Sequence, residues 1–348
     1  MPPSESLRSG AVALPSIGRA TARRTLGVLV VLAAAAGAGS LLVGTGDLSD
    51  PRLGPTYLEL RGARFGAAFL AGATLAVGGT VVQGLFRNPL ADPSILGTTA
   101  GASLGGRLAL LSLHLLAGGA AAALVAPEML LPLGSLAGAL LALFLLLAVQ
   151  RAGDDLVVLL LTGFLLSSLF VSLGAFAATL AQDRFELARA MLDFSLGGVG
   201  GAGLRRVALA MPLAIAGIAA AMLWARPLDL MLSGEDEARA LGVDVREVRR
   251  ACILWTAVLT AAAVSVGGTV GFVGLIVPHA LRRFVGAGHR ALVPASALGG
   301  GTFLVACDVL TRVLPTRSEI PLGVVTGLIG APLFLVLLAR SRRELVHV

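Results

Sequence analysis

Residues 156–182 read LVVLLLTGFLLSSLFVSLGAFAATLAQ and contain no charged side chain. About 20 apolar residues are enough for an α-helix to cross the hydrocarbon core of a bilayer, so this stretch predicts a transmembrane helix. The whole chain has the same character, since 56% of its 348 residues are hydrophobic and 14% are charged. A soluble domain is about a quarter charged. The composition therefore excludes a cytosolic enzyme, a disordered chain and a nucleic-acid module, and predicts a polytopic membrane protein.

The same criterion locates nine further spans, so the chain is predicted to be all-α with about ten transmembrane helices. Two spans tolerate a charge, Arg107 in one and Asp308 in the other. A window from Ala251 to Leu281 is too long for one helix, and its glycines and Pro278 divide it in two. The apolar stretch His114–Pro127 is too short for a span and is expected to be external or re-entrant. The predicted spans are Thr25–Gly46, Phe65–Phe86, Pro93–Leu113, Met129–Gln150, Leu156–Gln182, Val207–Ala225, Ala251–Gly268, a short one through Pro278 to Val285, Ala291–Thr311 and Ile320–Ala339.

All 27 basic residues are arginines, and the chain has no lysine. With ten spans and both ends inside, 17 arginines fall on cytoplasmic segments and nine on external ones, which follows the positive-inside rule. The paired arginines before the first apolar run are also compatible with a signal peptide, but nine more spans favour a retained helix. We therefore expect an N-in, C-in protein with a disordered cytoplasmic N-terminus over residues 1–24. A transmembrane domain over residues 25–340 and a cytoplasmic tail over residues 341–348 complete the predicted organisation.

A five-residue sequence, VGGTV, occurs twice, as Val77–Val81 and Val266–Val270. In both copies a proline follows at the same interval, Pro89 and Pro278. The copies lie at the ends of the second and seventh predicted spans, so they are expected to cross the membrane in opposite directions. Inverted repeats are typical of transporters with alternating access. The fold is therefore predicted to consist of two halves of inverted topology, the alternative being a coincidence of Gly- and Val-rich composition.

The longest polar insertion between spans is residues 226–250, on the predicted cytoplasmic side. Within it, residues 233–242 read SGEDEARALG and predict a short helix with both ends marked. Ser233 is the predicted N-cap, Asp236 occupies the capping-box position, and Gly242 can take the left-handed conformation that ends a helix. The acidic residues fall in the first turn, where the helix dipole favours them. The residues between the two ends are Gly234, Glu235, Asp236, Glu237, Ala238, Arg239, Ala240 and Leu241.

Ala238 and Leu241 are three residues apart, so this short helix is predicted to turn both toward a partner. A capped helix that carries both charge and apolar side chains between two spans is suited to docking on a soluble protein. On spacing alone, docking and a solvated loop helix are equally good interpretations.

Three longer motifs resemble a known family. Gln83–Gly97 is similar to the loop after the second span in permeases of ATP-binding-cassette importers for iron chelates, haem and vitamin B12. Gly271–His279 resembles the seventh-to-eighth span signature of that family, and Glu319–Phe334 resembles its tenth span. The resemblance covers roughly Leu58 to Leu338, with the motifs in order at the expected spacing.

The resemblance implies a permease subunit that moves a bulky metal chelate inward, an iron-siderophore, haem or cobalamin. It implies a homodimer or close heterodimer in the bacterial inner membrane, with two cytoplasmic ATPase subunits below and a periplasmic or lipid-anchored binding protein above. ATP and Mg would bind to the partner ATPase, and no cofactor or metal to this chain. Because a P-loop needs a lysine, a chain without lysine cannot hydrolyse ATP by that route and is not expected to be an enzyme.

The resemblance also assigns roles to individual residues. The family's coupling helix matches Gly234–Gly242, and its external arginines, which meet acidic residues of the binding protein, match Arg61, Arg64 and Arg312. Exposed arginines suit such partners because a guanidinium can bind both oxygens of a carboxylate. The alternative for each is a solvated charge at the end of a span. The family's inner gate matches Asn88 and Leu90, whereas the facing position, which carries small hydroxyl residues in relatives, is here Leu156-Val157.

The translocation pathway is expected along the fifth and tenth spans. Ser168, Ser172 and Thr179 lie at spacings of four and seven, so they share a helix face that we expect to line the pathway together with Thr162. Thr326 is their counterpart on the tenth span. The alternative is that these hydroxyls bond to the backbone of their own helix.

Two polar residues inside spans have competing interpretations. Asp308 is costly to bury as a charge, and Arg312 lies one turn further on, so a structural ion pair is favoured over a proton relay. His279 follows Pro278, and a helix-end role is favoured over haem ligation. The runner-up function is a secondary transporter driven by an ion gradient, which would use Asp308 as its coupling site but would leave the cytoplasmic helix without a role.

Overall fold

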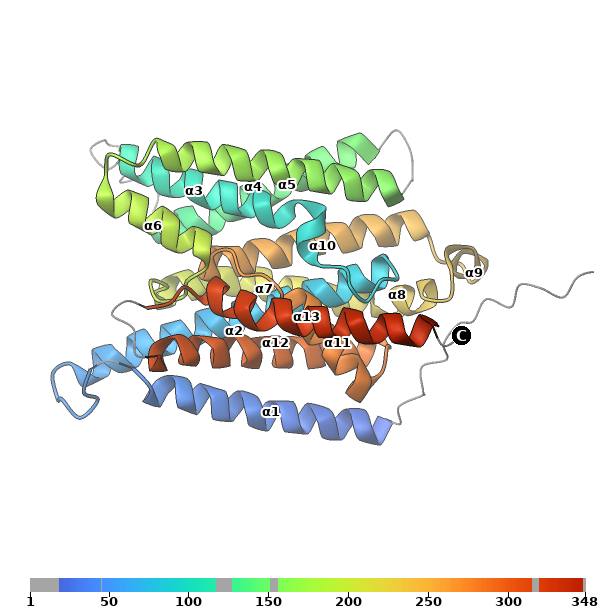
Figure 1. Ribbon diagram of the computed structural model, residues 1–348, viewed down its shortest axis with the longest axis horizontal. Helices are drawn as coiled ribbons and strands as arrows, with labels where there is room; N and C mark the ends of the chain where they lie inside the picture. Colours follow the sequence, from blue (N-terminus) through green and yellow to red (C-terminus); the bar gives the residue numbers. More distant parts are fainter. Residues whose placement is uncertain (1–18, 45, 117–126, 151–155, 315–318, 347–348) are drawn as a thin grey trace, which may run out of the picture.

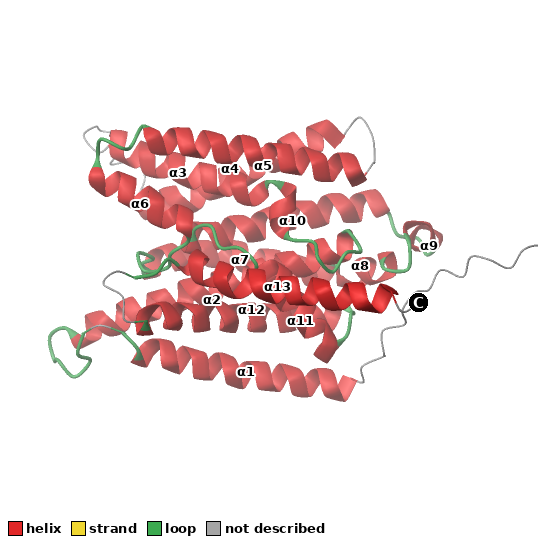
Figure 2. Cartoon of the chain, in the orientation of Figure 1, coloured by secondary structure: helices red, strands yellow, loops and turns green. Residues whose placement is uncertain are grey.

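The structure is a computed structural model that describes residues 19–44, 46–116, 127–150, 156–314 and 319–346. These residues form helices and loops, and no strand occurs among them (Figure 2). The helices are α1 (Arg19–Leu42), α2 (Gly54–Leu85), the 3₁₀-helix η1 (Pro93–Leu96), α3 (Thr98–Leu116), α4 (Pro127–Gln150), α5 (Leu156–Thr179), α6 (Phe185–Leu196), α7 (Leu204–Leu223), α8 (Ala225–Met231), α9 (Glu235–Ala240), α10 (Val245–Gly267), α11 (Val273–Val285), α12 (His289–Val313) and α13 (Leu322–Val346).

Each predicted span coincides with a helix, and the all-α fold is confirmed. Among the described residues, seven helices are long and apolar enough to cross a membrane, namely α1, α2, α4, α5, α7, α10 and α12, while α3, α11 and α13 occupy the other three predicted spans. Several boundaries differ from the prediction, the largest at the start of α2, which begins at Gly54 rather than Phe65. Helix α1 begins at Arg19, six residues before the expected start of the domain, and α13 continues to Val346, beyond the expected end. Most of the His114–Pro127 segment lies outside the described residues.

Helices α2 and α10 form the centre of the molecule. Most of their residues are buried, whereas α1 and α5 are largely exposed. Helix α2 packs against α12, α11, α7 and α10, and α10 also contacts α3 and α4. Figure 1 shows α3, α4 and α5 as one layer and α1, α2 and α12 as another, with α10 between them. The exposed outer helices are apolar, as expected where lipid replaces water.

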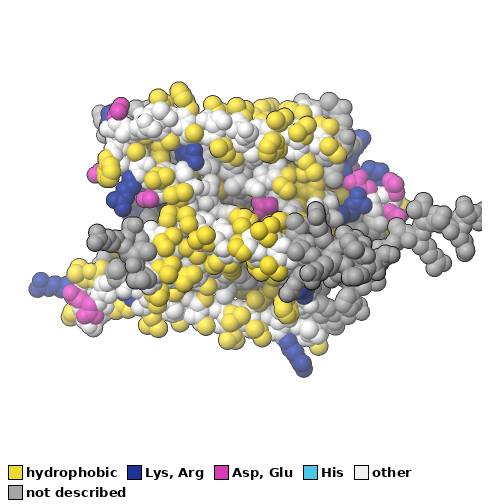
Figure 3. Space-filling view, viewed as in Figure 1, with side chains coloured by type: hydrophobic (Ala, Val, Ile, Leu, Met, Phe, Trp, Pro, Cys, Tyr) yellow, Lys and Arg dark blue, Asp and Glu magenta, His cyan; other side chains and the backbone are white. Residues whose placement is uncertain are grey.

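Charged side chains gather mainly at the two ends of the long axis, and apolar ones cover the middle (Figure 3). The start of α1, the end of α13 and the short helix α9 lie at one end (Figure 1). Residues 46–53, which lead into α2, and the loop between α6 and α7 lie toward the opposite end. The long axis is therefore the direction in which the chain crosses the membrane.

Helix α6 was not predicted. Its sequence, FELARAMLDFSL, buries Leu187, Met191 and Phe194, which are spaced by four and three residues and so share one face. This amphipathic spacing was visible in the sequence, but the segment is too short and too charged to pass as a span. The end of α6 is hydrogen-bonded to the segment after α10 and to the start of α13. The amide of Thr269 donates to the Phe194 carbonyl (3.2 Å), and the amide of Leu322 donates to the Gly197 carbonyl (2.8 Å).

The repeated VGGTV sequence lies on helices that run in opposite directions, as predicted, since α2 runs toward the end of the molecule that holds α9 and α10 runs away from it (Figure 1). The two copies nevertheless differ in local structure. Residues 77–81 lie within α2, which continues to Leu85, whereas α10 ends inside the second copy and Gly268 adopts a positive φ of 64°. The matching prolines differ as well, because Pro89 lies in a loop and Pro278 lies within α11. The pentapeptide alone therefore does not define the repeat.

Candidate functional site

Helix α9 is present where a short capped helix was predicted, but its N-terminal cap differs. The N-cap is Gly234, with φ 142°, and no side chain caps the helix, so the prediction of Ser233 as N-cap is wrong. The C-terminal prediction is confirmed, since Gly242 has φ 83°. The amides of Gly242 and Val243 donate to the carbonyls of Arg239 (2.9 Å) and Ala238 (3.0 Å), which is the Schellman arrangement.

Helix α9 is fixed to the rest of the chain by one acid and one small residue. Glu235 accepts a hydrogen bond from Arg249 of α10 (2.8 Å) and also pairs with Arg239 (3.4 Å). Ala238 is fully buried, so the expectation that it faces a partner protein is wrong. Leu241, by contrast, is 66% exposed, and the Asp236 side chain is 93% exposed. The exposed surface of α9 therefore carries acidic side chains and Arg239, with Leu241 at its edge.

A second contact connects the region around α9 to the long helices. Oδ1 of Asp229, on α8, accepts from the backbone amide of His289 (2.8 Å) and lies 2.6 Å from Nδ1 of its ring. His289 begins α12 and is completely buried. Its Nε2 faces α2 at Gly84, where an added Cβ would overlap the ring. Asp229 and His289 are 60 residues apart, and no sequence pattern pointed to this pair.

Replacing Asp229 with alanine is expected to lower the stability of the protein by about 1–3 kcal/mol, because it leaves the His289 amide and ring nitrogen without their acceptor. Asp229→Asn should cost less, since its amide oxygen can still accept from the backbone amide. Asp236→Ala, which removes an almost fully exposed carboxylate nearby, is the control. The melting temperatures of the purified variants measure the effect, and equal values for D229A and D236A would contradict it.

The predicted gate loop lies between α2 and η1. Asn88 is exposed and its Oδ1 accepts from the amide of Leu90 (2.9 Å), which folds the loop into a turn. Nε2 of Gln83 donates to the carbonyls of Gly274 (3.2 Å) and Leu275 (3.1 Å) in α11. The His279 ring donates to the Pro89 carbonyl, so it holds this loop to α11. The structure thus brings together two motifs that are about 190 residues apart in the sequence.

Asp92 ends the same loop and caps η1. Its Oδ1 accepts from the backbone amide of Ser94 (2.9 Å). Burial raises the pKa of this carboxyl above its ordinary value, although the hydrogen bonds from Ser94 act in the opposite direction. The loop therefore enters the next span through a turn made by its own side chains.

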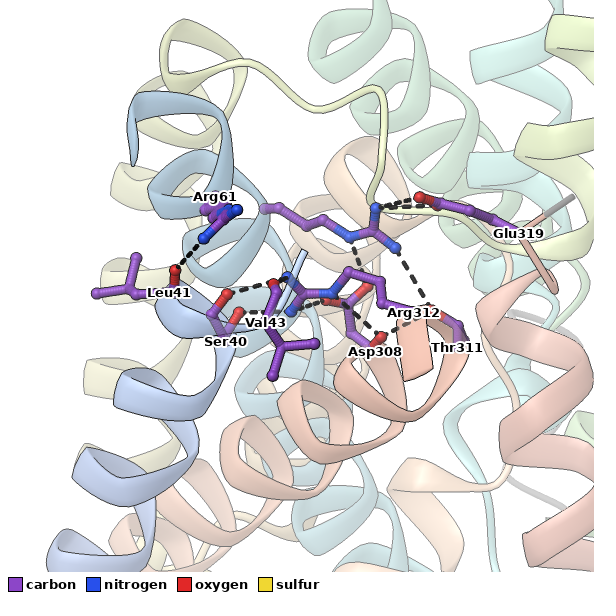
Figure 4. Close-up of polar contacts among 9 residues, drawn as sticks. Ser40, Leu41, Val43, Arg61, Asp308, Thr311, Arg312 and Glu319 are labelled. Atoms are coloured by element: carbon purple, nitrogen blue, oxygen red, sulfur yellow. Dashed lines mark hydrogen bonds and ion pairs between the residues drawn. The ribbon is translucent and has the colours of Figure 1, made fainter. Parts of the chain in front are cut away.

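The three arginines expected to receive a binding protein lie at the end opposite α9, but they are not exposed. Arg61 is 7% exposed and donates to the carbonyls of Leu41 (2.9 Å) and Gly46 (3.0 Å). The Arg312 side chain is 5% exposed and donates to the carbonyls of Ser40 (2.9 Å) and Val43 (2.6 Å). Both arginines therefore satisfy carbonyls at the C-terminal end of α1, where the helix dipole favours positive charge (Figure 4).

Asp308 is the centre of this network. Its Oδ2 lies 2.9 Å from Nη2 of Arg312, which confirms the predicted ion pair. Its Oδ1 accepts from Nε of Arg64 (2.8 Å), a partner that the sequence did not suggest. Arg64 also pairs with Glu319 (2.9 Å), just before α13 (Figure 4). The network therefore holds together α1, α2, α12 and the segment that leads into α13.

Three of the hydroxyl groups predicted to line a pathway, those of Ser172, Thr179 and Thr326, bond to their own helices. Ser172 donates to the Ser168 carbonyl (2.9 Å) and Thr179 to the Ala175 carbonyl (3.0 Å). Ser168, Ser172 and Thr179 are all exposed on one face of α5. Thr162 is half-buried. Thr326 is fully buried and donates to the Gly323 carbonyl (3.1 Å), so it faces no opening within this chain.

A cavity of 540 Å³ lies between η1, α3 and α5. It was not predicted, and the α5 hydroxyl in its wall is Ser167 rather than Ser168 or Ser172. Arg107, the charge inside the third span, also lines it. Its apolar wall includes Phe164 and Phe170.

Known proteins share this architecture. The model of the FecCD transport family matches residues 25–340. The cobalamin import system permease protein BtuC of Halobacterium salinarum is 41% identical over 77% of this chain and 69% of its own length. The hemin transport system permease protein HmuU of Yersinia pestis is 35% identical over 94% of this chain and 98% of its own. The Fe(3+) dicitrate transport system permease protein FecD of Escherichia coli is 37% identical over 82% and 85%.

A solved structure gives the same result at the level of the fold. It is described as an inward-facing conformation of a metal-chelate type ABC transporter, and it superposes with a TM-score of 0.79 at 30% identity. The match covers 91% of this chain and 99% of that one. The chain therefore belongs to the FecCD transport family and is a multi-pass membrane permease of the ABC-importer type.

Proposed function

We propose that this chain is the permease subunit that moves a bulky metal chelate, an iron-siderophore, haem or cobalamin, inward across the bacterial inner membrane. The proposal rests on α9, a short acidic helix held between α8 and α10 at one end of the spans. The names of the relatives support the class of substrate, since they refer to cobalamin, hemin and ferric dicitrate. A chain without lysine cannot supply a P-loop, so ATP and Mg would bind to a separate ATPase, and this chain would bind no cofactor.

The way in which α9 is attached supports a coupling role for residues 233–242. The ion pair between Glu235 and Arg249 connects it to α10, and the pair of Asp229 and His289 connects the adjoining α8 to α12. A push on α9 by two cytoplasmic ATPase subunits would therefore reach two long helices directly. The start of α1 and the end of α13 lie at the same end as α9, which supports the N-in, C-in orientation (Figure 1).

The opposite end would receive the substrate-binding protein. Arg61, Arg64 and Arg312 lie there, but their guanidinium groups are bonded within the chain, so we propose that they shape this surface rather than reach the partner's carboxylates. A second permease copy would complete the pathway against α5, whose exposed side chains are almost all apolar, with Ser168, Ser172 and Thr179 facing it. Asn88 and Leu90 would form the inner gate.

The alternative of an ion-driven secondary transporter has less support. Asp308 was its coupling site, and both of its oxygens are engaged by arginines at 2.8 and 2.9 Å. Uptake of chelate into vesicles tests the two functions. We expect accumulation only when the partner ATPases and ATP are present, and uptake driven by an ion gradient without them would contradict the importer function.

Leu241→Asp is expected to weaken binding of the ATPase subunits at least tenfold, because it places a charge on the exposed apolar position of α9. Co-purification of the ATPase with the tagged permease measures this binding. Leu204→Asp is the matched control, since Leu204 is 47% exposed but lies at the opposite end of the molecule. Equal retention of the ATPase by both variants would show that α9 is not the docking helix.

A further inference from the structure

Three polar residues form a stripe along one face of α3. Thr99, Ser103 and Arg107 are four residues apart, and all three line the 540 Å³ cavity. Positions separated by four residues lie one above another on a helix. Helix α3 therefore directs two hydroxyls and a guanidinium into the same space, within a span where polar groups are costly and usually functional.

Two polar atoms of this stripe lack hydrogen-bond partners. Ser103 is 6% exposed, and neither its Oγ nor Nε of Arg107 is bonded. Within the part of the chain that the structure describes, no carboxylate pairs with Arg107. Arg61 and Arg312, by contrast, are bonded to carbonyls of α1. Arg107 is thus a half-buried charge that no described carboxylate neutralises, and its guanidinium faces the cavity.

The volume and the lining of the cavity suit a small-molecule site. Its volume lies in the range of about 300–1,000 Å³ that is typical of small-molecule sites, and such sites are mostly apolar with a few convergent polar groups. Phe164 and Phe170 of α5 supply the apolar wall, and Gly174 leaves room beside Nη1 of Arg107, which an added Cβ would approach to 2.5 Å. A guanidinium with free donors is suited to a carboxylate, which it can bind through both oxygens.

We propose that this cavity receives a carboxylate group of the transported chelate, with Arg107 as its ion-pair partner and Ser103 as a hydrogen-bond donor beside it. The proposal rests on the importer function given above and narrows its cargo to anionic, carboxylate-bearing chelates. Such a cavity would select against chelates that carry only neutral groups, because these would leave Arg107 without a counter-charge.

The test uses the complete transporter in phosphatidylcholine vesicles with haem, haem dimethyl ester, ferric citrate and cyanocobalamin as probes. Haem and its dimethyl ester have the same macrocycle, but the ester has no free carboxylate. We expect at least tenfold faster uptake of a carboxylate-bearing chelate than of those without one. Arg107→Ala should remove this preference mainly by raising KM, and Arg107→Lys should restore part of it. Arg189→Ala, an exposed arginine of α6, should change nothing.

Two outcomes would overturn the proposed carboxylate site while leaving the importer function in place. One is a wild-type preference for chelates without carboxylates, and the other is an equal loss of all uptake in R107A. If no probe enters in an ATP-dependent way, the proposed importer function fails instead. In that case the site is still tested by modification of Arg107 with phenylglyoxal, which citrate should slow at least fivefold. Absence of protection by citrate, or equal protection by phosphatidylglycerol alone, which would indicate a lipid site, would overturn the proposal.

Discussion

Asp308→Ala is expected to lower the free energy of unfolding by about 3–5 kcal/mol, because it leaves two arginines facing each other in a buried site without their shared counter-charge. Arg64 and Arg312 approach Asp308 to 2.8 and 2.9 Å, and the Asp308 side chain is 1% exposed. The loss should appear as a lower melting temperature in detergent and as unfolding at a lower denaturant concentration.

The matched control is Glu59→Ala, which removes an exposed carboxylate from the same helix as Arg64. The double variant Arg64→Leu with Asp308→Leu should recover much of the stability, since Arg312 keeps its bonds to the Ser40 and Val43 carbonyls. An unfolding free energy for D308A that is no lower than that of E59A would show that the network contributes nothing. No recovery in the double variant would show that the loss comes from packing rather than from unpaired charge.

The same network shows what the sequence could and could not predict. The pair of Asp308 and Arg312 was predictable because residues four apart on one helix always lie close together. The pair of Arg64 and Asp308 was not, because 244 residues separate them and the rotation of α2 against α12 decides whether they meet. For the same reason the sequence predicted that three arginines lie at one end of the spans but not that they are largely buried there, which depends on where the end of α1 lies.

Local features of the sequence also differed in how well they predicted the structure. Spans were predicted well because about 20 apolar residues have few alternatives to a membrane helix. Helix α9 was located by its composition, but its buried face was predicted incorrectly, since six residues of helix give little periodicity and Ala238 fits either side. Arg107 was noticeable as an unpaired charge within a span, although only the folded chain shows the cavity and the hydroxyls around it.

Gly79→Ala is expected to destabilise the protein by about 1–3 kcal/mol, because it adds a methyl group where two helices touch through their backbones. In α2, a Cβ at Gly79 would overlap the carbonyl oxygen of Gly274 in α11. The approach is close from both sides, since a Cβ at Gly274 would lie 2.9 Å from the Leu75 carbonyl oxygen. Gly78→Ala is the matched control, because its Cβ would meet Pro93 at an ordinary 3.5 Å. The difference between the two melting temperatures measures the effect.

The same substitution should impair transport more than assembly. Displacing α11 from α2 moves the carbonyls of Gly274 and Leu275 away from Gln83, and it moves His279 away from the Pro89 carbonyl in the proposed gate loop. Helix α9 is attached through α8 and α10 instead, so ATPase subunits should still co-purify with G79A. We therefore expect chelate uptake to fall at least tenfold in G79A and to stay near the wild-type rate in G78A. Equal uptake by the two variants would show that the crossing of α2 and α11 accommodates a methyl group, and that the gate loop does not depend on this contact.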